Sequence, residues 1–579
     1  MSRDHPSLHT FLPTSRKELD MRGWDNVDII LFSGDAYIDH PSFGIAVIGR
    51  VLEAEGYRVA IIPQPNWQDD LRDFKKLGRP RLFFGVSSGN MDSMVNHYTA
   101  AKRLRSNDAY TPEGRVGARP DRAVTLYTRI LKQLYPDVPV VIGGIEASLR
   151  RLSHYDYWDD QWKPSILTES GADYLVYGMG EQAIKELAYQ MRHKVPPEKL
   201  RQTLQIAYIA TNDSILPQNH LMLKSYEICL RDHHACIDNF TLVEFESNQT
   251  HPKALVEPFG AHFVVVNPPN PPMESRELDA IYELPFTRLP HPRYKGKHIP
   301  AYQMIKHSIC LHRGCFGGCS FCTIAVHQGK QIISRTEESI IREVRTQVIH
   351  PEFKGILSDL GGPSANMYGM QGKNQTICNA CIRTSCLFPK ICKNLNNDHT
   401  RLTTLYRAVQ KEPGIRHAFI SSGIRYDLFL DEHRFFNDDG RDYFEQVVRC
   451  HTSGRFKVAP EHTENHVLNY MEKPSFQLFE RLKHYFDQIN THEGLKLQLT
   501  PYFISSHPGC TQKDMAALSK KLHSHQMSIE QVQDFTPTPM TRSSVMFYTK
   551  KEMKTKKEIF VAQTNILKMK QKEYFFKKK

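Results

Sequence analysis

Residues 308–322 read Ser-Ile-Cys-Leu-His-Arg-Gly-Cys-Phe-Gly-Gly-Cys-Ser-Phe-Cys, a short apolar segment followed by a cysteine-rich loop. The last three cysteines, Cys315, Cys319 and Cys322, have the spacing C-x3-C-x2-C, and the glycines between them let the backbone wrap closely around a ligand. Three such thiolates can bind three irons of a [4Fe–4S] cluster and leave the fourth iron open to a small molecule. The loop therefore predicts an iron–sulfur cluster held by these three side chains.

Zinc and inert thiols are the alternatives for this loop. A zinc site needs a fourth ligand within a few residues, and the near one is His327, at a spacing that is uncommon for zinc. The N-terminal residues lack the apolar stretch of a secretory signal. We therefore expect a cytoplasmic location and no disulfide bonds.

Further motifs are spread along the chain. They are Gly34-Asp35-Ala36-Tyr37-Ile38-Asp39-His40-Pro41, Ser88-Gly89-Asn90-Met91-Asp92-Ser93-Met94, Gly143-Gly144-Ile145-Glu146-Ala147-Ser148-Leu149-Arg150-Arg151, His154-Tyr155-Asp156-Tyr157-Trp158, His312-Arg313-Gly314-Cys315 and Lys457-Val458-Ala459-Pro460-Glu461-His462. With them the chain resembles the YgiQ-type radical SAM proteins over roughly residues 10–550. The resemblance implies a [4Fe–4S] cluster and S-adenosylmethionine, whose reductive cleavage gives a 5′-deoxyadenosyl radical. It implies no particular substrate.

The N-terminal region, residues 1–210, alternates apolar runs with helical patterns. The expected strands are 27–32, 59–62, 82–86, 138–142 and 174–177. Expected helices follow Ser42, span 122–134 and begin at Glu181. This alternation predicts an α/β domain with a doubly wound parallel sheet, in which ligands bind at the carboxyl ends of the strands.

This domain is similar to the cobalamin-binding Rossmann-like domains fused to some radical SAM enzymes. Their lower-axial signature is D-x-H-x-x-G, whereas Asp39 and His40 are adjacent here. Cobalamin is therefore not expected, although some relatives bind it without the signature. Helix capping and loop hydrogen bonds are the alternative roles for Asp35, Asp39 and His40.

Residues 211–300 contain the run Pro268-Pro269-Asn270-Pro271-Pro272, and we interpret them as an extended connector. Residues 301–540 again alternate strands and helices. The expected strands are 308–311, 355–360, 417–421, 456–459, 495–503 and 530–535. Six such units indicate a partial (β/α)6 barrel, which is the radical SAM core that the resemblance implies, and Ser334-Arg335-Thr336-Glu337 is interpreted as a capping box.

Several candidate site residues follow these strands. In radical SAM enzymes a Gly-Gly segment binds the amino group of S-adenosylmethionine through backbone carbonyls, which corresponds here to Gly361 and Gly362. Ser422 and Arg425 are expected to bind the ribose and the carboxylate, because a guanidinium pairs well with a carboxylate. A structural role for Arg425 is the alternative. The candidates for proton transfer are Glu461, His462 and His507.

A second cysteine set, Cys378, Cys381, Cys386 and Cys392, has the spacing C-x2-C-x4-C-x5-C in an insertion over residues 364–398. Four thiolates fit an auxiliary [4Fe–4S] cluster or a zinc ion, and the irregular spacing favours the cluster. The other cysteines are expected to be neutral thiols.

The net charge of +12 is concentrated at the C-terminal end. Residues 550–579 hold 11 lysines and 3 glutamates, and we interpret 541–579 as a basic tail, solvated and partly disordered. Together with the second cysteine set, this tail makes a zinc-dependent nucleic-acid-binding protein one alternative function, and an iron–sulfur electron carrier is another. The leading prediction is a radical SAM enzyme that takes an electron from a donor such as flavodoxin or ferredoxin. No apolar run is long enough to span a membrane.

Overall fold

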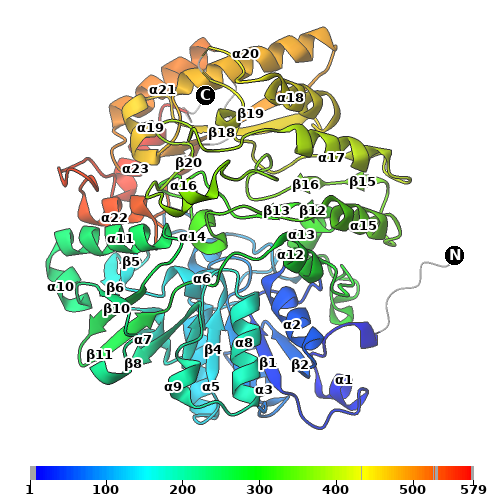
Figure 1. The fold of residues 1–579 in the computed structure, drawn as a ribbon, viewed down its shortest axis with the longest axis vertical. Helices are drawn as coiled ribbons and strands as arrows, with labels where there is room; N and C mark the ends of the chain where they lie inside the picture. Colours follow the sequence, from blue (N-terminus) through cyan, green and yellow to red (C-terminus); the bar gives the residue numbers. More distant parts are fainter. Residues whose placement is uncertain (1–7, 432, 526, 528–531, 576–579) are drawn as a thin grey trace. The chain divides into compact units, whose positions relative to one another are not determined.

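The computed structural model describes residues 8–431, 433–525, 527 and 532–575 (Figure 1). The chain forms two compact units. Unit 1 comprises Met1–Ser247, His251–Pro272 and Ala280–Lys306, and unit 2 comprises Asn248–Thr250, Met273–Asp279 and His307–Lys579. Both are built from strands and helices that alternate along the chain.

Unit 1 contains a sheet of nine strands in the order β2-β1-β3-β4-β7-β8-β11-β10-β9 (Figure 1). Its first five strands are parallel and confirm all five predicted strands of the N-terminal region. They are β1 (Ile29–Ser33), β2 (Val59–Pro63), β3 (Phe83–Ser87), β4 (Val140–Gly143) and β7 (Tyr174–Val176). Every residue of β1 and β2 is buried, which is typical of parallel strands covered on both faces.

Helices connect these strands and cover the sheet. Helix α2 (Gly44–Ala54) packs against α8 (Glu181–Arg192), and α5 (Ala123–Leu134) packs against β3, β4 and α7 (Ile166–Ser170). The other helices and strands of this region are α1 (Arg16–Asp20), α3 (Arg72–Lys75), α4 (Ser93–His97), α6 (Gly144–Leu149), β5 (His154–Asp156), β6 (Gln161–Lys163), α9 (Pro197–Leu200), α10 (Tyr226–Arg231), α11 (His233–Ser247) and α13 (Pro300–Ile305). Helix α12 (Ser275–Tyr282) begins in unit 2 and ends in unit 1.

The prediction of a purely parallel sheet is wrong for the remaining strands of this sheet. Strands β7–β8, β8–β11 and β11–β10 pair antiparallel, so the sheet is mixed. The added strands are β8 (Ile206–Ala210), β9 (His220–Met222), β10 (Ala254–Phe259) and β11 (His262–Val266). Three of them lie in residues 211–300, which we interpreted as a connector. The short apolar runs of β10 and β11 form a hairpin that turns at Gly260 (φ +55°), and the proline run 268–272 lies outside it.

Unit 2 contains the predicted strands of residues 301–540 as parallel groups. Strand β12 pairs with β16, β15 pairs with β17, and β18, β19 and β20 follow one another in a single sheet. Their bounds are β12 (Ser308–Cys310), β15 (Ile356–Leu357), β16 (Asp359–Gly361), β17 (His417–Ala418), β18 (Arg455–Glu461), β19 (Gln498–Ser505) and β20 (Val532–Asp534). The second predicted strand is split in two, and residues 530–531 of the last lie outside the described part.

Helices follow these strands as expected. They are α15 (Glu337–Val348), α17 (Thr400–Lys411), α18 (Asp438–Cys450), α19 (Asn465–Met471), α20 (Phe476–His492) and α21 (Gln512–Ser524). The predicted capping box is wrong in its position. The N-cap of α15 is Thr336, whose hydroxyl accepts from the backbone N–H of Ser339, whereas Ser334 lies in β14 (Ile333–Ser334) and binds Gly369 instead.

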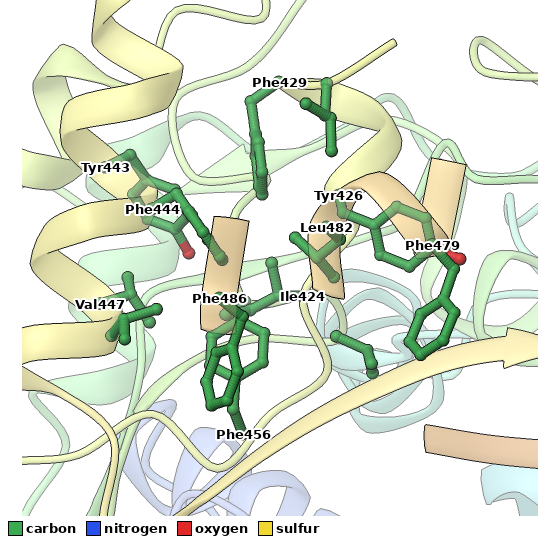
Figure 2. Packing of buried hydrophobic residues seen from close by; sticks show 14 of the residues in the cluster. Ile424, Tyr426, Phe429, Tyr443, Phe444, Val447, Phe456, Phe479, Leu482 and Phe486 are labelled. Atoms are coloured by element: carbon green, nitrogen blue, oxygen red, sulfur yellow. The ribbon is translucent and has the colours of Figure 1, made fainter. Parts of the chain in front are cut away.

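An aromatic core holds unit 2 together (Figure 2). Phe429 of the loop after β17 stacks on Phe444 of α18, and Phe444 meets Phe456 of β18 edge to face at 5.8 Å. Phe486 of α20 also packs on Phe456, at 5.6 Å between ring centroids. Each fully buried aromatic side chain contributes about 1.5–3 kcal/mol through apolar burial, so this core fixes the strand ends that carry the candidate site.

The C-terminal region is folded in the part that the structure describes. Helices α22 (Arg542–Thr549) and α23 (Asn565–Lys572) belong to unit 2, and α23 packs against α21 and β19. Lys568 and Gln571 are buried, so the interpretation of a solvated tail is wrong for residues 541–575. In the described residues no helix is both long and apolar enough to cross a membrane.

Candidate functional site

The predicted cluster loop lies between β13 (His312–Arg313) and α14 (Ile324–Gln328), directly after the first strand of unit 2. Cys315 is buried, and Cys319 and Cys322 are half-buried. All three are free thiols. The loop thus holds its cysteines at the carboxyl end of a parallel strand, where such folds place their chemistry.

The backbone of this loop requires glycine at its start. Gly314 has a φ of +89°, and a side chain there would collide with the carbonyl oxygen of Gln331. The next residue, Cys315, donates its backbone N–H to the carbonyl of Gly329 at 3.1 Å. The segment 329–331 therefore holds the first cysteine in place.

The three thiols lie close enough to affect one another. Burial, together with the charges of Cys319 and Cys315, raises the pKa of Cys322 to about 12. Burial also raises the pKa of Cys315, while the Arg425 guanidinium lowers it in part. Thiolates in this position need a strong positive charge beside them, which a bound metal centre supplies.

In the described residues no group of three or more His, Cys, Asp or Glu side chains is arranged to hold a metal ion. The preference for an iron–sulfur cluster over zinc at this loop therefore rests on the C-x3-C-x2-C spacing, which has no fourth zinc ligand at a common distance.

Arg425 lies beside the cysteine loop, but its guanidinium group already has hydrogen-bond partners. Its Nη1 donates to the sulfur of Cys319 at 3.2 Å. Its Nε and Nη2 donate to the two carboxylate oxygens of Asp427, at 2.9 and 2.6 Å. A side chain at Gly317 would come within 2.5 Å of Arg425 Nη1. The carboxylate of Asp427 therefore occupies the position on Arg425 where a ligand carboxylate was expected to bind. The remaining Nη1 of the guanidinium faces Cys319, a predicted cluster ligand.

The core of unit 2 fixes this arginine in position. Its neighbours Ile424 and Tyr426 are both buried in the aromatic core (Figure 2). Tyr426 also packs against Phe479 of α20, at 6.5 Å between ring centroids. The backbone on either side of Arg425 is thus anchored, and the guanidinium is pre-organised for its two partners.

The predicted serine and glycine positions come together at the end of β16. Asp359 accepts from the backbone N–H groups of Ser421 and Ser422, at 2.8 and 3.1 Å, and from the Ser422 hydroxyl. Burial raises the pKa of Asp359. A side chain at Gly361 would lie 3.0 Å from the Ser422 hydroxyl. Gly361 and Ser422 therefore lie side by side, and the Ser422 hydroxyl donates its hydrogen bond to Asp359.

Gly362 packs against the imidazole of His312, and a side chain at Gly362 would collide with the ring. His312 is fully buried, and burial lowers its pKa to about 3, so the ring is neutral. The Gly-Gly pair thus lets this backbone pass close to β13, near the start of the cysteine loop.

Glu461 is the proton-transfer candidate at the carboxyl end of β18. It ends β18 with a φ of +68°, a strained conformation for a residue with a side chain. Its carboxylate is buried 3.7 Å from Lys473, and its charge contributes to the raised pKa of Cys322. Burial raises the pKa of Glu461 itself, while Lys473 and Arg425 lower it in part. A strained, buried carboxyl group beside the loop is consistent with a functional role.

His507 is tied into the structure instead. Its Nδ1 lies 2.9 Å from the carbonyl of Pro508, so the proton is on Nδ1 and Nε2 accepts from the Ser543 hydroxyl at 2.7 Å. Ser543 in turn contacts Ser320 of the cysteine loop, hydroxyl to hydroxyl at 2.8 Å and N–H to carbonyl at 3.0 Å. Burial lowers the pKa of His507 to about 3. Its geometry is that of a residue that positions the loop.

His462 is also buried and hydrogen-bonded. Its Nδ1 accepts from the backbone N–H of Glu464 at 3.0 Å, and its Nε2 lies 3.5 Å from the sulfur of Cys510. Burial lowers its pKa to about 3. These contacts support a structural role in the turn after β18.

The second cysteine set lies in the insertion and belongs to unit 2. Cys378 is in the short helix α16 (Gln375–Asn379), and Cys381, Cys386 and Cys392 are in the loops that follow. All four are half-buried free thiols.

In unit 1, the Asp39 and His40 pair has structural partners. Asp39 forms a bidentate ion pair with Arg50 inside the sheet domain. His40 accepts from the backbone of Ser42 through Nδ1, and its Nε2 lies 3.2 Å from Arg288. Both ring nitrogens are engaged and the residue is fully buried, so His40 does not fit the role of a cobalamin axial ligand.

Sequence reasoning missed several residues of this site, among them Asp427, Lys473 and Ser543. Asp427 lies two residues after Arg425, and an acid so close to a buried arginine was an available signal. Ser543 is 223 positions from its partner Ser320, and nothing local in the sequence connects them.

Comparison with known proteins agrees with these features. The sequence model of the family described as Radical SAM N-terminal matches residues 11–308. A UPF0313 protein of Bacteroides thetaiotaomicron is 55% identical over 586 residues, which cover 98% of this chain and 94% of that protein. The UPF0313 protein YgiQ of Salmonella typhimurium is 40% identical, over 93% of this chain and 81% of that protein.

A weaker likeness exists to a solved structure, the radical S-adenosylmethionine methyltransferase TsrM from Kitasatospora setae with tryptophan substrate and a SAM analog bound. Its TM-score is 0.49 at 14% identity, covering 89% of this chain and 74% of that chain. The sequence relationships are much closer and extend over nearly the whole chain. The chain belongs to the UPF0313 family of radical SAM proteins, to which YgiQ also belongs.

Proposed function

We propose that this protein is a radical SAM enzyme in which Cys315, Cys319 and Cys322 hold a [4Fe–4S] cluster. The observation that carries the proposal is the buried three-cysteine loop at the end of β12, with Arg425 donating to the sulfur of Cys319. Three thiolates and a cation are a suitable donor set and charge partner for an iron–sulfur cube with one open iron.

The cluster, once bound with S-adenosylmethionine and given an electron by a donor such as flavodoxin or ferredoxin, supplies a 5′-deoxyadenosyl radical. The residues of the chain shield and orient that chemistry. Phe316 is buried within the loop and keeps water away. Arg425 offsets the negative charge that the thiolates bring into a buried site.

Contacts to S-adenosylmethionine are proposed at the ends of the next two strands. Gly361 and Gly362 offer backbone carbonyls for its amino group, and Asp359 orients Ser422 for the ribose. The proposed role of Arg425 is to donate hydrogen bonds to the sulfur of Cys319 and to the carboxylate of Asp427. The strands of unit 2 are proposed to form the partial (β/α)6 barrel typical of such enzymes.

Glu461 is the proposed proton-transfer residue, because its buried carboxyl group has a raised pKa and lies near the cysteines. His462 and His507 are proposed as positioning residues. His40 is fully engaged within unit 1 and is not proposed as an axial ligand of cobalamin. The substrate is an organic molecule with an unactivated carbon, from which the radical abstracts hydrogen.

The test is anaerobic formation of 5′-deoxyadenosine. The protein is reconstituted with iron and sulfide, reduced with dithionite, mixed with S-adenosylmethionine and analysed by mass spectrometry. We expect product from the wild type and from Cys450→Ser, a control at an exposed thiol outside the site, and none from Cys315→Ala. Equal product from Cys315→Ala, or no cluster in the wild type, would contradict the proposal.

A further inference from the structure

Four cysteines of unit 2 have no part in the proposed reaction. We propose that Cys378, Cys381, Cys386 and Cys392 bind a second [4Fe–4S] cluster, next to the first. The place of this cluster beside the first one rests on the proposed function, but its ligands are a separate set, and the test counts the metal of each set separately.

Backbone contacts bring the four residues together in pairs. Cys381 donates its N–H to the carbonyl of Cys378 at 3.0 Å, and Cys392 donates its N–H to the carbonyl of Cys386 at 2.7 Å. The two pairs are also linked to each other, because Asn394, two residues beyond Cys392, donates through Nδ2 to the sulfur of Cys378 at 3.2 Å. The insertion therefore folds its four thiols toward a common region.

Asn394 closes this arrangement on the side of Cys378. Its Nδ2 donates to the sulfur of Cys378 at 3.2 Å and to the carbonyl of Asn374 at 2.9 Å. Because Asn394 is two residues beyond Cys392, these bonds hold the first and last cysteines of the set near each other. An N–H donated to sulfur also stabilises a thiolate ligand. Gly372 packs so closely on the Cys378 sulfur that a side chain there would collide with it.

Positive charges surround the third cysteine. Arg383 folds back between the second and third cysteines and donates through Nη2 to the carbonyls of Phe388 and Lys390, at 3.0 and 2.6 Å. Lys330 donates to the carbonyl of Arg383. Both cations thus lie at the segment that carries Cys381 and Cys386. A four-thiolate cube carries net negative charge, so cations at its edge are a suitable environment.

The spacing of the four cysteines favours a cluster over zinc. The four sulfurs are free thiols. Paired zinc knuckles usually have two short, regular spacings, whereas this loop has the irregular spacing C-x2-C-x4-C-x5-C, which fits a larger ligand.

The insertion is docked directly on the first cysteine loop. Cys386 donates its N–H to the carbonyl of Phe316 at 3.1 Å, and the Ser385 hydroxyl donates to the carbonyl of Gly317 at 2.7 Å. Gly318, with a φ of +65°, leaves room for Ser385 against the loop. A shared apolar cluster lies between the two sets; it contains Cys315, Phe316, Met367, Met370, Leu387, Leu395 and Leu428, with Cys386 and Cys392 packed against it. The hydrogen bond from Cys386 to Phe316 therefore connects a ligand of the second proposed cluster to the residue that follows Cys315, a ligand of the first.

Iron counting in two complementary variants tests the site. One variant replaces Cys315, Cys319 and Cys322 with Ala, and the other replaces the four cysteines of the insertion with Ser. Iron, sulfide and zinc are measured after anaerobic reconstitution, with Mössbauer spectra to identify the cluster type. We expect about eight irons in the wild type and about four in each variant, all as [4Fe–4S]. Zinc in place of iron in the first variant, or no metal, would overturn the inference.

A milder variant covers the case in which the fourfold replacement does not fold. Gly372→Ala places a methyl group against the Cys378 sulfur, whereas Gly44→Ala, with no neighbour within 4 Å of the new methyl, is the matched control. We expect Gly372→Ala to lose a large part of the insertion's iron and keep the other four, and Gly44→Ala to keep all eight. Full iron in Gly372→Ala, together with unchanged spectra, would count against Cys378 as a ligand.

Electron paramagnetic resonance tests the closeness of the two centres. When both clusters are reduced by dithionite, each is paramagnetic, and neighbouring spins broaden and split one another's signals. We expect the spectrum of the reduced wild type to differ from the sum of the two variants' spectra. A spectrum equal to that sum would show that the centres are far apart and would overturn their proposed adjacency.

Discussion

The two units use similar strand ends very differently. In unit 1, polar side chains after the strands neutralise one another, as in the buried ion pairs of Arg119 with Asp35 and Asp108, at 3.0 and 3.2 Å. In unit 2, the corresponding positions carry thiols and a strained carboxyl group, Glu461, whose pKa values are raised by burial. Polar groups that satisfy one another stabilise a fold, whereas three thiols on one loop, together with a strained carboxyl group, indicate a place for a ligand.

The sharpest contrast is between two buried or half-buried thiols. Cys319→Ala in unit 2 should abolish 5′-deoxyadenosine formation, at least 100-fold below the wild type, because it removes a proposed cluster ligand. Cys236→Ala in unit 1 should leave it unchanged, because this thiol donates to the carbonyl of Cys229 and packs in the core. Mass spectrometry of the product, normalised to protein, checks both. Activity lost in Cys236→Ala with full iron content would break the comparison.

The next prediction concerns the ion pairs of unit 1. Arg119→Met should lower the free energy of unfolding by about 3–5 kcal/mol, because Asp35 and Asp108 would be left buried without their cation. Chemical denaturation measures this change, and the cluster absorbance of the folded protein should stay as in the wild type. Arg72→Met is the matched control, since the Arg72–Asp70 pair is exposed and should contribute less than about 1 kcal/mol.

If Arg119→Met were as stable as the wild type, or if it lost its cluster while still folded, the assignment of a purely structural role to this part of unit 1 would be wrong. The effect on stability and the effect on the cluster are therefore measured on the same sample.

The third prediction uses a carboxyl group of unit 1 whose partner is a serine. Glu257 accepts from the backbone N–H and the hydroxyl of Ser153, and burial raises its pKa from 4.5 to about 7. The folded protein then holds this proton more tightly than the unfolded chain does. Its contribution to stability is present below about pH 4.5 and is lost as the pH rises toward about 7.

Glu257→Gln removes this titration and keeps the size of the side chain. The stability of the wild type relative to the variant should therefore fall by about 2–3 kcal/mol between pH 4.5 and 7.5, because each unit of pKa shift corresponds to about 1.4 kcal/mol. Denaturation curves at a series of pH values check this slope. A difference that is constant across the range would show that Glu257 does not titrate there.

The contrast between the units also shows what the sequence could predict. Local spacing was sufficient for the cysteine loop and for the strands β1 to β4, whose apolar runs are continuous. Local composition was misleading for β10 and β11, because neighbouring prolines hid a short hairpin, and for the lysine-rich end, where Lys568 is buried in α23. Thr336 and not Ser334 caps α15, which depends on where the chain leaves β14.

Roles set by distant partners were the hardest to predict. Arg425 is of the residue type expected to bind a carboxylate of a ligand, yet its guanidinium already binds the carboxylate of Asp427. His507 and His462 are typical proton-transfer residues by type, but their ring nitrogens are engaged by neighbours that lie far away in the sequence or in the local turn. Residue type predicts what a side chain can do, whereas its partners decide what it does.

The smallest expected effect separates positioning from proton transfer at His507. Ser543→Ala removes the hydroxyl that links His507 to Ser320 of the cysteine loop, and should cost about 1–2 kcal/mol. The loop should then release iron to a chelator several-fold faster, while 5′-deoxyadenosine formed per intact cluster and its pH profile stay unchanged. Ser524→Ala, at an exposed hydroxyl bound to Lys521, is the control and should change neither. A lower yield per cluster with a shifted pH profile in Ser543→Ala would instead give the histidine a direct role in proton transfer, and would place it with Glu461 among the groups that unit 2 keeps available for chemistry.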